Sequence, residues 1–304
     1  MNKQNHPIMK RNKIIKKWQT IGFTILLSGI TATSCQNKQE SQTTETDNVN
    51  YITTSINKED SKSTLGCKIY ADYPEKGSPF LLQNIREWIN ETLGGSYAGD
   101  LKNGKAVIEY YAQSINDRLK KDEAEFGSSP DMGGSVYYVQ MRKAFETCLF
   151  VTYTNEIYQY YSGAAHGGQT YTGAVFRKTD GRKMGWDVFK QDSLNCINDM
   201  IKEQIKTQFF KIKDDKSFYD MLLIDNPELF FPLPKTDPLF MEKGVMFIYQ
   251  QYEIAPYAAG RPSCTIPYER LKDYFTTTAL PLAESHTDSI ATKTKNGIIK
   301  LNVE

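Results

Sequence analysis

The sequence predicts an α+β protein: an antiparallel sheet with helices packed mainly on one face, preceded by a smaller strand-helix-helix region. A change in hydrophobic period predicts this class. Apolar residues recur at helical spacing over about residues 79–93 and 103–123, whereas from residue 136 onward they alternate with polar residues in steps of two. Helices therefore come first along the chain, and a group of strands follows them.

The first elements carry recognisable end signals. The alternating stretch 67–73 predicts a strand that stops at Pro74. Ser78 is suited to cap a helix that has Pro79 at its first position, and a glycine pair ends that helix. A loop rich in glycine, serine and proline at 127–134 separates the two early helices from the strands that follow.

The rest of the chain predicts a strand meander with two later helices. Thr179-Asp180-Gly181 is typical of a tight hairpin turn. An amphipathic helix is expected at about 194–209, with Asp192 as its N-cap. Residues 211–238 predict an irregular crossing. Strands are expected at 136–141, 147–153, 156–161, 170–177 and 245–252, and a short helix at 268–275 closes the domain.

The first 35 residues have the order of an export signal. Six Lys and Arg residues precede an apolar run from Ile21 to Ala32, and small residues then lead to Cys35. This ending resembles the lipobox of bacterial lipoproteins, in which the cysteine is diacylated and becomes the first mature residue. The run is shorter than the roughly 20 apolar residues that span a bilayer, so a retained signal-anchor helix is the weaker alternative. We expect a lipid anchor on Cys35 in the cell envelope, with the outer membrane favoured over the inner, and the protein facing the periplasm or the cell surface.

Composition divides the chain into five segments. We expect a signal at 1–34, a disordered tether at 35–65, an N-terminal α/β subdomain at 66–130, a C-terminal α+β domain at 131–276 and a polar tail at 277–304. The signal holds six of the 37 Lys and Arg residues and none of the 36 Asp and Glu residues, so the mature chain has a net charge of −5. That sign argues against nucleic acid as a partner.

The cysteines do not predict a redox or metal site. Apart from Cys35, the four cysteines allow three disulfide pairings, and their spacing does not choose among them. No pair has the C-x-x-C spacing of redox or zinc sites. We expect mainly buried thiols with at most one disulfide, and no metal or cofactor. The four are Cys67, Cys148, Cys196 and Cys264.

Three stretches in this order resemble one family. They are Tyr161 to Gly168 (YSGAAHGG), Phe176 to Phe189 (FRKTDGRKMGWDVF) and Tyr252 to Phe275 (YEIAPYAAGRPSCTIPYERLKDYF). Together they resemble the C-terminal ectodomain of RsiV-type anti-sigma factors, a domain of unknown function. The region from residue 67 to about 125 resembles the small domain that often precedes it, which is also found beside polysaccharide deacetylases. One departure is Ala164, where the family commonly has a second glycine.

The resemblance implies ligand recognition rather than sigma-factor binding. Anti-sigma members carry a cytoplasmic sigma-binding domain before a spanning helix, and here only about 20 residues precede the apolar run, too few for a folded domain. Members of that type sense lysozyme by binding it. The matched motifs do not specify the contact residues, so no contact residue follows from the resemblance.

The candidate ligand-binding residues surround one histidine. His166 is the only histidine of the predicted folded region, and it is either a general acid/base or ligand contact, or a turn residue bonded to nearby backbone. The structural role is the stronger interpretation, because no catalytic partner is evident. Nearby glycines let backbone approach a ligand, and tyrosines supply flat surface, although tyrosine is also a common strand residue. The full candidate set is His166, Gly163, Gly167, Gly168, Tyr160, Tyr161 and Tyr171.

No catalytic residue can be assigned from the sequence. Asp180 and Asp187 could be paired acids as in glycosidases, but a turn and a helix start already explain them. The first hypothesis is a lipid-anchored envelope protein that binds an extracellular protein such as lysozyme, or a peptidoglycan-type glycan. The alternative is an enzyme, or an enzyme accessory, acting on envelope polysaccharide. Convergent polar groups with perturbed titration in one pocket would favour the enzyme.

Overall fold

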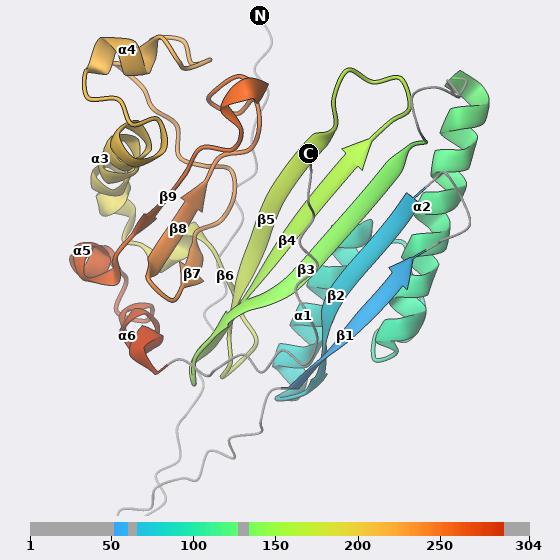
Figure 1. Cartoon of the computed structure of the whole chain (residues 1–304). Helices are drawn as coiled ribbons and strands as arrows, with labels where there is room; N and C mark the ends of the chain where they lie inside the picture. Colours follow the sequence, from blue (N-terminus) through green and yellow to red (C-terminus); the bar gives the residue numbers. More distant parts are fainter. Residues whose placement is uncertain (1–51, 60–65, 127–133, 289–304) are drawn as a thin grey trace, which may run out of the picture. The chain divides into compact units, whose positions relative to one another are not determined.

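A computed structural model of the chain describes residues 52–59, 66–126 and 134–288, with strand 52–59 described by its backbone (Figure 1). The predicted signal at 1–34, the lipidation residue Cys35, most of the predicted tether and the end of the predicted tail lie outside these residues. Within the described ranges, none of the helices combines the length and the hydrophobicity that crossing a bilayer requires.

Two sheets organise the described residues, and they confirm the α+β class. The larger sheet has six strands in the order β1-β2-β3-β4-β5-β6, antiparallel except for the parallel pair β2 and β3. The smaller sheet has the antiparallel order β7-β8-β9. The strands are β1 (Ile52–Glu59), β2 (Gly66–Lys76), β3 (Val136–Glu146), β4 (Phe150–Tyr160), β5 (Gly168–Arg177), β6 (Lys183–Met184), β7 (Leu239–Met241), β8 (Gly244–Ile248) and β9 (Ser263–Ile266).

Helices α1 (Pro79–Leu93) and α2 (Gly104–Phe126) form at the expected ranges, and they cover one face of the larger sheet (Figure 1). The Ser78 hydroxyl accepts the Leu81 N–H at 3.5 Å and caps α1, and Gly94 ends it with a φ of 129°. The Tyr111 hydroxyl on α2 donates to Asn90 Oδ1 on α1 at 2.6 Å, which ties the two helices together.

Successive side chains of β4 and β5 point to opposite faces of the larger sheet, and both faces are buried. Val151 and Phe176 pack on the side of α1 and α2, whereas Phe150 and Val175 pack into the opposite core. That opposite core contains the smaller sheet, and Thr152 Oγ1 donates to the Phe240 carbonyl oxygen at 2.6 Å to join the two layers. It also contains residues of α3 (Leu194–Gln204), α4 (Asp215–Tyr219), α5 (Tyr268–Leu271) and α6 (Leu280–Glu284).

Two of the expected segment boundaries differ from the structure. Strand β1 lies inside the expected tether of 35–65, because a polar edge strand can be held by backbone pairing to β2 without burying many apolar side chains. The expected boundary at residue 130 cuts through the larger sheet, since β2 pairs with β3 from Gly66 opposite Val136 to Ala71 opposite Met141. Residues 66–130 therefore share one core with β3, β4 and β5.

The expected start of the polar tail, residue 277, is also wrong, because the folded part continues beyond it. Helix α6 and the following turn at 285–287 pack into the core, and Ala279, Leu282 and Ala283 are buried. The buried Ser285 hydroxyl donates to the Leu282 carbonyl oxygen at 2.8 Å. Five residues of helix are too few to show a hydrophobic period, so the sequence carried no signal for this element.

Two separate strands were predicted at 147–153 and 156–161. The structure instead has one strand there, because β4 runs unbroken from Phe150 to Tyr160. All four cysteines within the described residues are free thiols, so the allowance for a disulfide is not needed. Mainly buried thiols were expected, but only Cys67 and Cys264 are buried, whereas Cys148 and Cys196 are exposed.

Candidate functional site

A surface pocket of about 320 Å³ lies at the loop between β4 and β5. Of the predicted candidates it is lined by Tyr161, His166 and Gly168, while Tyr160, Tyr171, Gly163 and Gly167 do not line it. We call this site the loop pocket. Its lining is Gln159, Tyr161, His166, Gly168, Gln169, Thr170, Gln250, Gln251, Tyr252 and Tyr257.

Two of the predicted glycines shape the loop instead of lining the pocket. Gly163 has a φ of 83°, and the turn around it is closed by the Ala164 N–H bonded to the Tyr161 carbonyl oxygen at 2.9 Å. A Cβ on Gly167 would lie 2.5 Å from the Tyr158 ring, so the glycine lets that ring pack against the loop backbone. These glycines therefore have a structural role.

His166 has both the structural contact and the exposed position that the sequence left open. Its Nδ1 lies 3.1 Å from the Gly167 carbonyl oxygen, as expected for a turn histidine. Its ring stacks on the Tyr257 ring, with centroids 3.8 Å apart and an angle of 21° between the planes. The centroid of the Tyr257 ring in turn lies 6.0 Å from that of the Tyr252 ring. Sequence reasoning missed both tyrosine partners, because they lie some ninety residues further along the chain.

Two glutamines after β8 fasten the opposite wall to the outer edge of β5. Gln250 Oε1 accepts the Tyr171 N–H at 2.9 Å, and Gln250 Nε2 donates to the Tyr171 carbonyl oxygen at 2.6 Å and to Thr236 Oγ1 at 2.8 Å. Gln251 Oε1 accepts the Gln169 N–H at 3.0 Å. The pocket wall is thereby pre-organised by an element of the larger sheet.

Tyr171 and its neighbours form a structural cluster beside the loop pocket. Burial raises the pKa of the Tyr171 hydroxyl. The Arg261 guanidinium lies 5.3 Å from the centre of the Tyr171 ring and donates to Glu156 Oε1 at 3.0 Å. This cation and this carboxylate are therefore paired with each other and do not supply an unpaired charge to a ligand.

Asp180 and Asp187 do not form a catalytic acid pair. Asp180 accepts the Arg177 guanidinium at 2.9 Å, and this bond, with the Arg182 N–H, lowers the pKa of Asp180 to about 2. Asp187 accepts from the Arg182 side chain and from the Gly185 N–H. Since a general acid needs a raised pKa, Asp180 is unsuited to that role and its carboxylate instead holds the β5–β6 hairpin.

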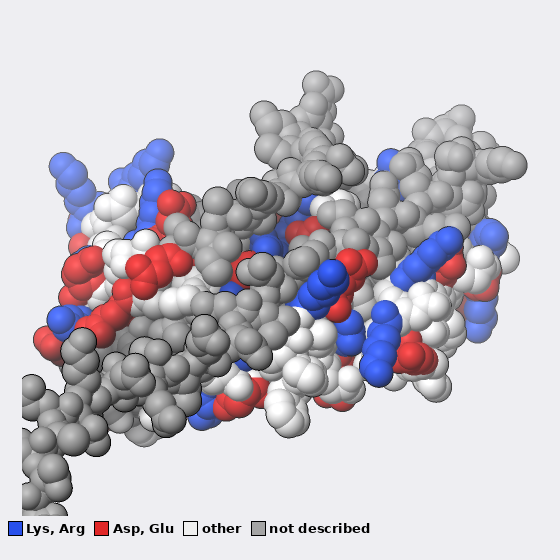
Figure 2. Space-filling model, turned by 90° about the horizontal axis from the view of Figure 1, so that it is seen from below, with Lys and Arg blue, Asp and Glu red and all other residues white. Residues whose placement is uncertain are grey.

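Charge does not single out a binding surface on the face drawn in Figure 2, where Lys and Arg of the described residues lie among Asp and Glu. Among the described lining residues of the loop pocket there is no Asp, Glu, Lys or Arg. A search of the described ranges found no group of three or more His, Cys, Asp and Glu residues placed to hold a metal ion.

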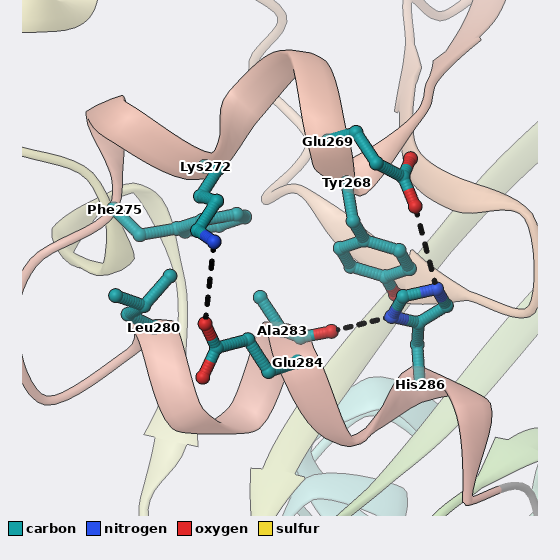
Figure 3. A pocket seen from close by; sticks show the side chains of 8 residues that line it. All are labelled: Tyr268, Glu269, Lys272, Phe275, Leu280, Ala283, Glu284 and His286. Carbon is teal, nitrogen blue, oxygen red and sulfur yellow. Dashed lines mark hydrogen bonds and ion pairs between the residues drawn. The ribbon is translucent and has the colours of Figure 1, made fainter.

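A second pocket of about 180 Å³ lies between α5 and α6 (Figure 3). His286 stacks on Tyr268 with ring centroids 4.4 Å apart, and its Nδ1 lies 2.8 Å from the Ala283 carbonyl oxygen. His286 was expected in the polar tail, but in the structure it belongs to the folded region. His166 is therefore not the only histidine of the folded region, although the sequence predicted that it was. At the rim, Lys272 Nζ and Glu284 Oε1 form a loose ion pair at 3.9 Å, and His286 Nε2 lies 3.9 Å from Glu269 Oε1. Exposed pairs of this length contribute little stability.

Comparison with known proteins finds one family model that matches part of the chain. The model of the family described as "Protein of unknown function (DUF3298)" matches residues 186–269, which include the Gln250–Tyr257 wall of the loop pocket. No curated protein matches the chain.

Solved structures of that family share the fold. A DUF3298 family member from Bacteroides fragilis has a TM-score of 0.61 at 17% identity, covering 78% of this chain and 97% of its own. A DUF3298 family protein from Pseudomonas aeruginosa has a TM-score of 0.52 at 14% identity, covering 76% of this chain and 96% of its own. At such low identity the likeness concerns the fold alone. Residues 186–269 of this chain form a DUF3298 domain.

Proposed function

We propose that the protein is a lipid-anchored component of a bacterial cell envelope whose folded part binds an extracellular ligand at the loop pocket without transforming it. The observation that carries this proposal is the pocket's lining: exposed aromatic rings and amide side chains, brought together from β4, β5 and the turn after β8. Such surfaces suit recognition, since flat rigid rings bury area at a low cost in conformational entropy.

The same lining supports a binding role over the enzymatic alternative. Acting on envelope polysaccharide would call for an acid–base pair or an activated nucleophile near the substrate. The only titratable groups of the described lining are His166 and three tyrosines, and the His166 ring is engaged by Gly167 and Tyr257. The two aspartates that could have formed a glycosidase pair are instead bound by arginines.

Two classes of ligand follow from the resemblance to RsiV-type ectodomains. One is an extracellular protein such as lysozyme, and the other is a peptidoglycan-type glycan. A screen of the full chain in detergent against lysozymes and peptidoglycan fragments tests both. A ligand found in this way should bind at least tenfold more weakly to a His166→Ala, Tyr161→Ala double variant, a loss of about 1.4 kcal/mol.

A matched double variant separates binding from stability. Tyr110 is exposed to a similar extent as Tyr161, 40% against 38%, and His286 is the other histidine of the described residues. Tyr110→Ala, His286→Ala should leave affinity unchanged because neither residue lines the loop pocket. If affinity survives in the loop-pocket variant while its melting temperature falls, the loop is structural and the proposal is wrong.

The envelope location has its own test. Replacing Cys35 with alanine removes the thiol that would carry the acyl chains. The variant should take up no labelled palmitate and should leave the membrane fraction. Unchanged labelling would rule out Cys35 as the anchor while leaving the binding role untouched.

A further inference from the structure

The loop pocket contains a backbone feature that points to a ligand. Tyr252 has a φ of 64°, in the left-handed region, where a side chain costs about 1–2 kcal/mol relative to glycine. The turn that holds it is closed by the Glu253 N–H bonded to the Gln250 carbonyl oxygen at 3.1 Å, and by the Gln250 N–H bonded to Glu253 Oε2 at 2.7 Å. Strain of this kind gathers at functional sites.

Burial does not explain why a tyrosine occupies this position. The Tyr252 side chain is 57% exposed, so its ring does not fill the core. It lines the loop pocket together with the exposed ring of Tyr161 and the stacked pair of His166 and Tyr257. The chain thus places an aromatic face in a pocket at a turn position where glycine would be unstrained.

We propose that the ligand of the loop pocket is an uncharged saccharide, with a sugar ring packed against Tyr252 and Tyr161. This inference rests on the binding role proposed above and specifies the class of ligand. A pyranose ring has an apolar face of C–H groups that packs on aromatic rings, and hydroxyl groups around its edge that need donors and acceptors.

The amide side chains of the pocket match that edge. Gln251 keeps its Nε2 donors for a ligand once its Oε1 has accepted the Gln169 N–H. Within residues 66–126 and 134–288, no hydrogen bond engages the side-chain amides of Gln159 and Gln169, which also line the pocket. Each amide offers both donors and an acceptor, as does a hydroxyl group, so the two chemistries are complementary.

The absence of charge among the described lining residues selects an uncharged ligand. A carboxylate, phosphate or ammonium group would lose hydration in the pocket without gaining a counter-ion, which is unfavourable. The carboxylate of Glu253, next to Tyr252 in the turn, accepts the Gln250 and Lys235 N–H groups. Arg261 and Glu156 are paired with each other. The volume of about 320 Å³ is at the lower end of the range of about 300–1,000 Å³ for small-molecule sites. It fits one or two sugar rings.

Pairs of charged and uncharged trisaccharides test whether the pocket prefers an uncharged ligand. Their binding to the full chain in detergent is measured by isothermal titration calorimetry. Chitotriose is compared with its N-deacetylated, cationic form, and α-1,4-galactotriose with trigalacturonate, its anionic form. We expect at least one uncharged sugar to bind at least tenfold more tightly than its charged counterpart. Equal affinity within both pairs, or no binding by either uncharged sugar, would overturn the inference.

A glycine substitution separates the ring from the fold. Tyr252→Gly relieves the left-handed strain, so its melting temperature should equal or exceed that of the parent chain while sugar affinity falls at least tenfold. Lys211 also has a positive φ, 58°, and does not line the pocket, so Lys211→Gly is the control that should keep full affinity. Unchanged sugar affinity in Tyr252→Gly would contradict the proposal.

The two proposals fail in different ways. If neither trisaccharide binds but a ligand from the envelope screen loses affinity in the His166→Ala, Tyr161→Ala variant, the saccharide assignment is wrong and the binding role stands. If the His166→Ala, Tyr161→Ala variant and the Tyr252→Gly variant both bind every screened ligand as the parent chain does, the saccharide assignment and the binding role are both wrong.

Discussion

The Gln250 side chain pairs with the backbone of Tyr171 as a neighbouring strand would. Its Oε1 accepts the Tyr171 N–H at 2.9 Å and its Nε2 donates to the Tyr171 carbonyl oxygen at 2.6 Å. Among the described strands, β6 pairs with the outer edge of β5 only at Val175 and Phe176, so none of them pairs with that edge at Tyr171. One amide therefore satisfies an edge that would otherwise be open to strand addition.

Removing this amide should destabilise the fold. Gln250→Ala leaves the N–H and carbonyl of Tyr171 without their partner, which costs on the order of 1–3 kcal/mol in unfolding free energy. Urea unfolding measures the loss. Gln113→Ala, which removes an exposed glutamine of α2 whose amide contacts only Asp117, is the control and should change stability by less than about 0.5 kcal/mol. Equal effects of the two substitutions would show that the Gln250 pairing contributes nothing.

The stability of a truncated chain should depend on whether the chain still contains strand β1. If 35–65 were the disordered tether expected from the sequence, a chain beginning at Thr64 would lose no stability. Because β1 pairs with β2 from Ile52 to Glu59, that chain should instead melt at a lower temperature than one beginning at Asn50, and it should self-associate through the exposed edge of β2. Differential scanning calorimetry and light scattering on both chains check this. Identical melting and monodisperse behaviour would show that β1 adds no stability.

Elements with strong local signals were predictable, and the missed ones lack such signals. Ser78, Pro79 and Gly94 bound α1 as expected, since caps depend on residues adjacent in sequence. Strands β3 and β5 were recognised in part, since the expected ranges 136–141 and 170–177 lie inside them. The smaller sheet was not separated from the larger one because its strands are three to five residues long, and pairing of β7 with β8 and β9 is set by tertiary contacts.

The site was half predictable for the same reason. Tyr161, His166 and Gly168 belong to one loop whose composition drew attention to it. Gln251 and Tyr252, the other wall, follow a strand in a segment predicted to continue as strand to residue 252. A left-handed φ at Tyr252 has no sequence signature, because that conformation is normally signalled by glycine.

Acid should selectively weaken the β5–β6 hairpin. The bond from Arg177 holds the pKa of Asp180 at about 2, below its value of about 3.9 in an unfolded chain. The carboxylate thus stabilises the fold fully above about pH 4 and loses this effect as the pH falls toward 2. The stability difference between the parent chain and Asp180→Asn, from urea unfolding, should shrink over that range.

The control for this titration is another aspartate in an exposed position. Asp199→Asn alters the exposed face of α3, where no described ion pair involves Asp199. Its stability difference from the parent should stay small at every pH. A difference for Asp180→Asn that does not vary between pH 5 and pH 2 would mean that the Arg177 contact does not stabilise the fold.

The four thiols of the described residues should divide into two reactive and two inert groups. Burial raises the pKa of both Cys67 and Cys264 to about 12, so almost none of either thiol is ionised at pH 8. Cys148 and Cys196 are exposed and should be alkylated by iodoacetamide within minutes in the native protein, as read by mass spectrometry of peptides. Unfolding in urea should make all four react alike, which controls for intrinsic reactivity. Native protection of Cys148 and Cys196 by a reducible bond would instead show a disulfide between them, against the free thiols of this structure.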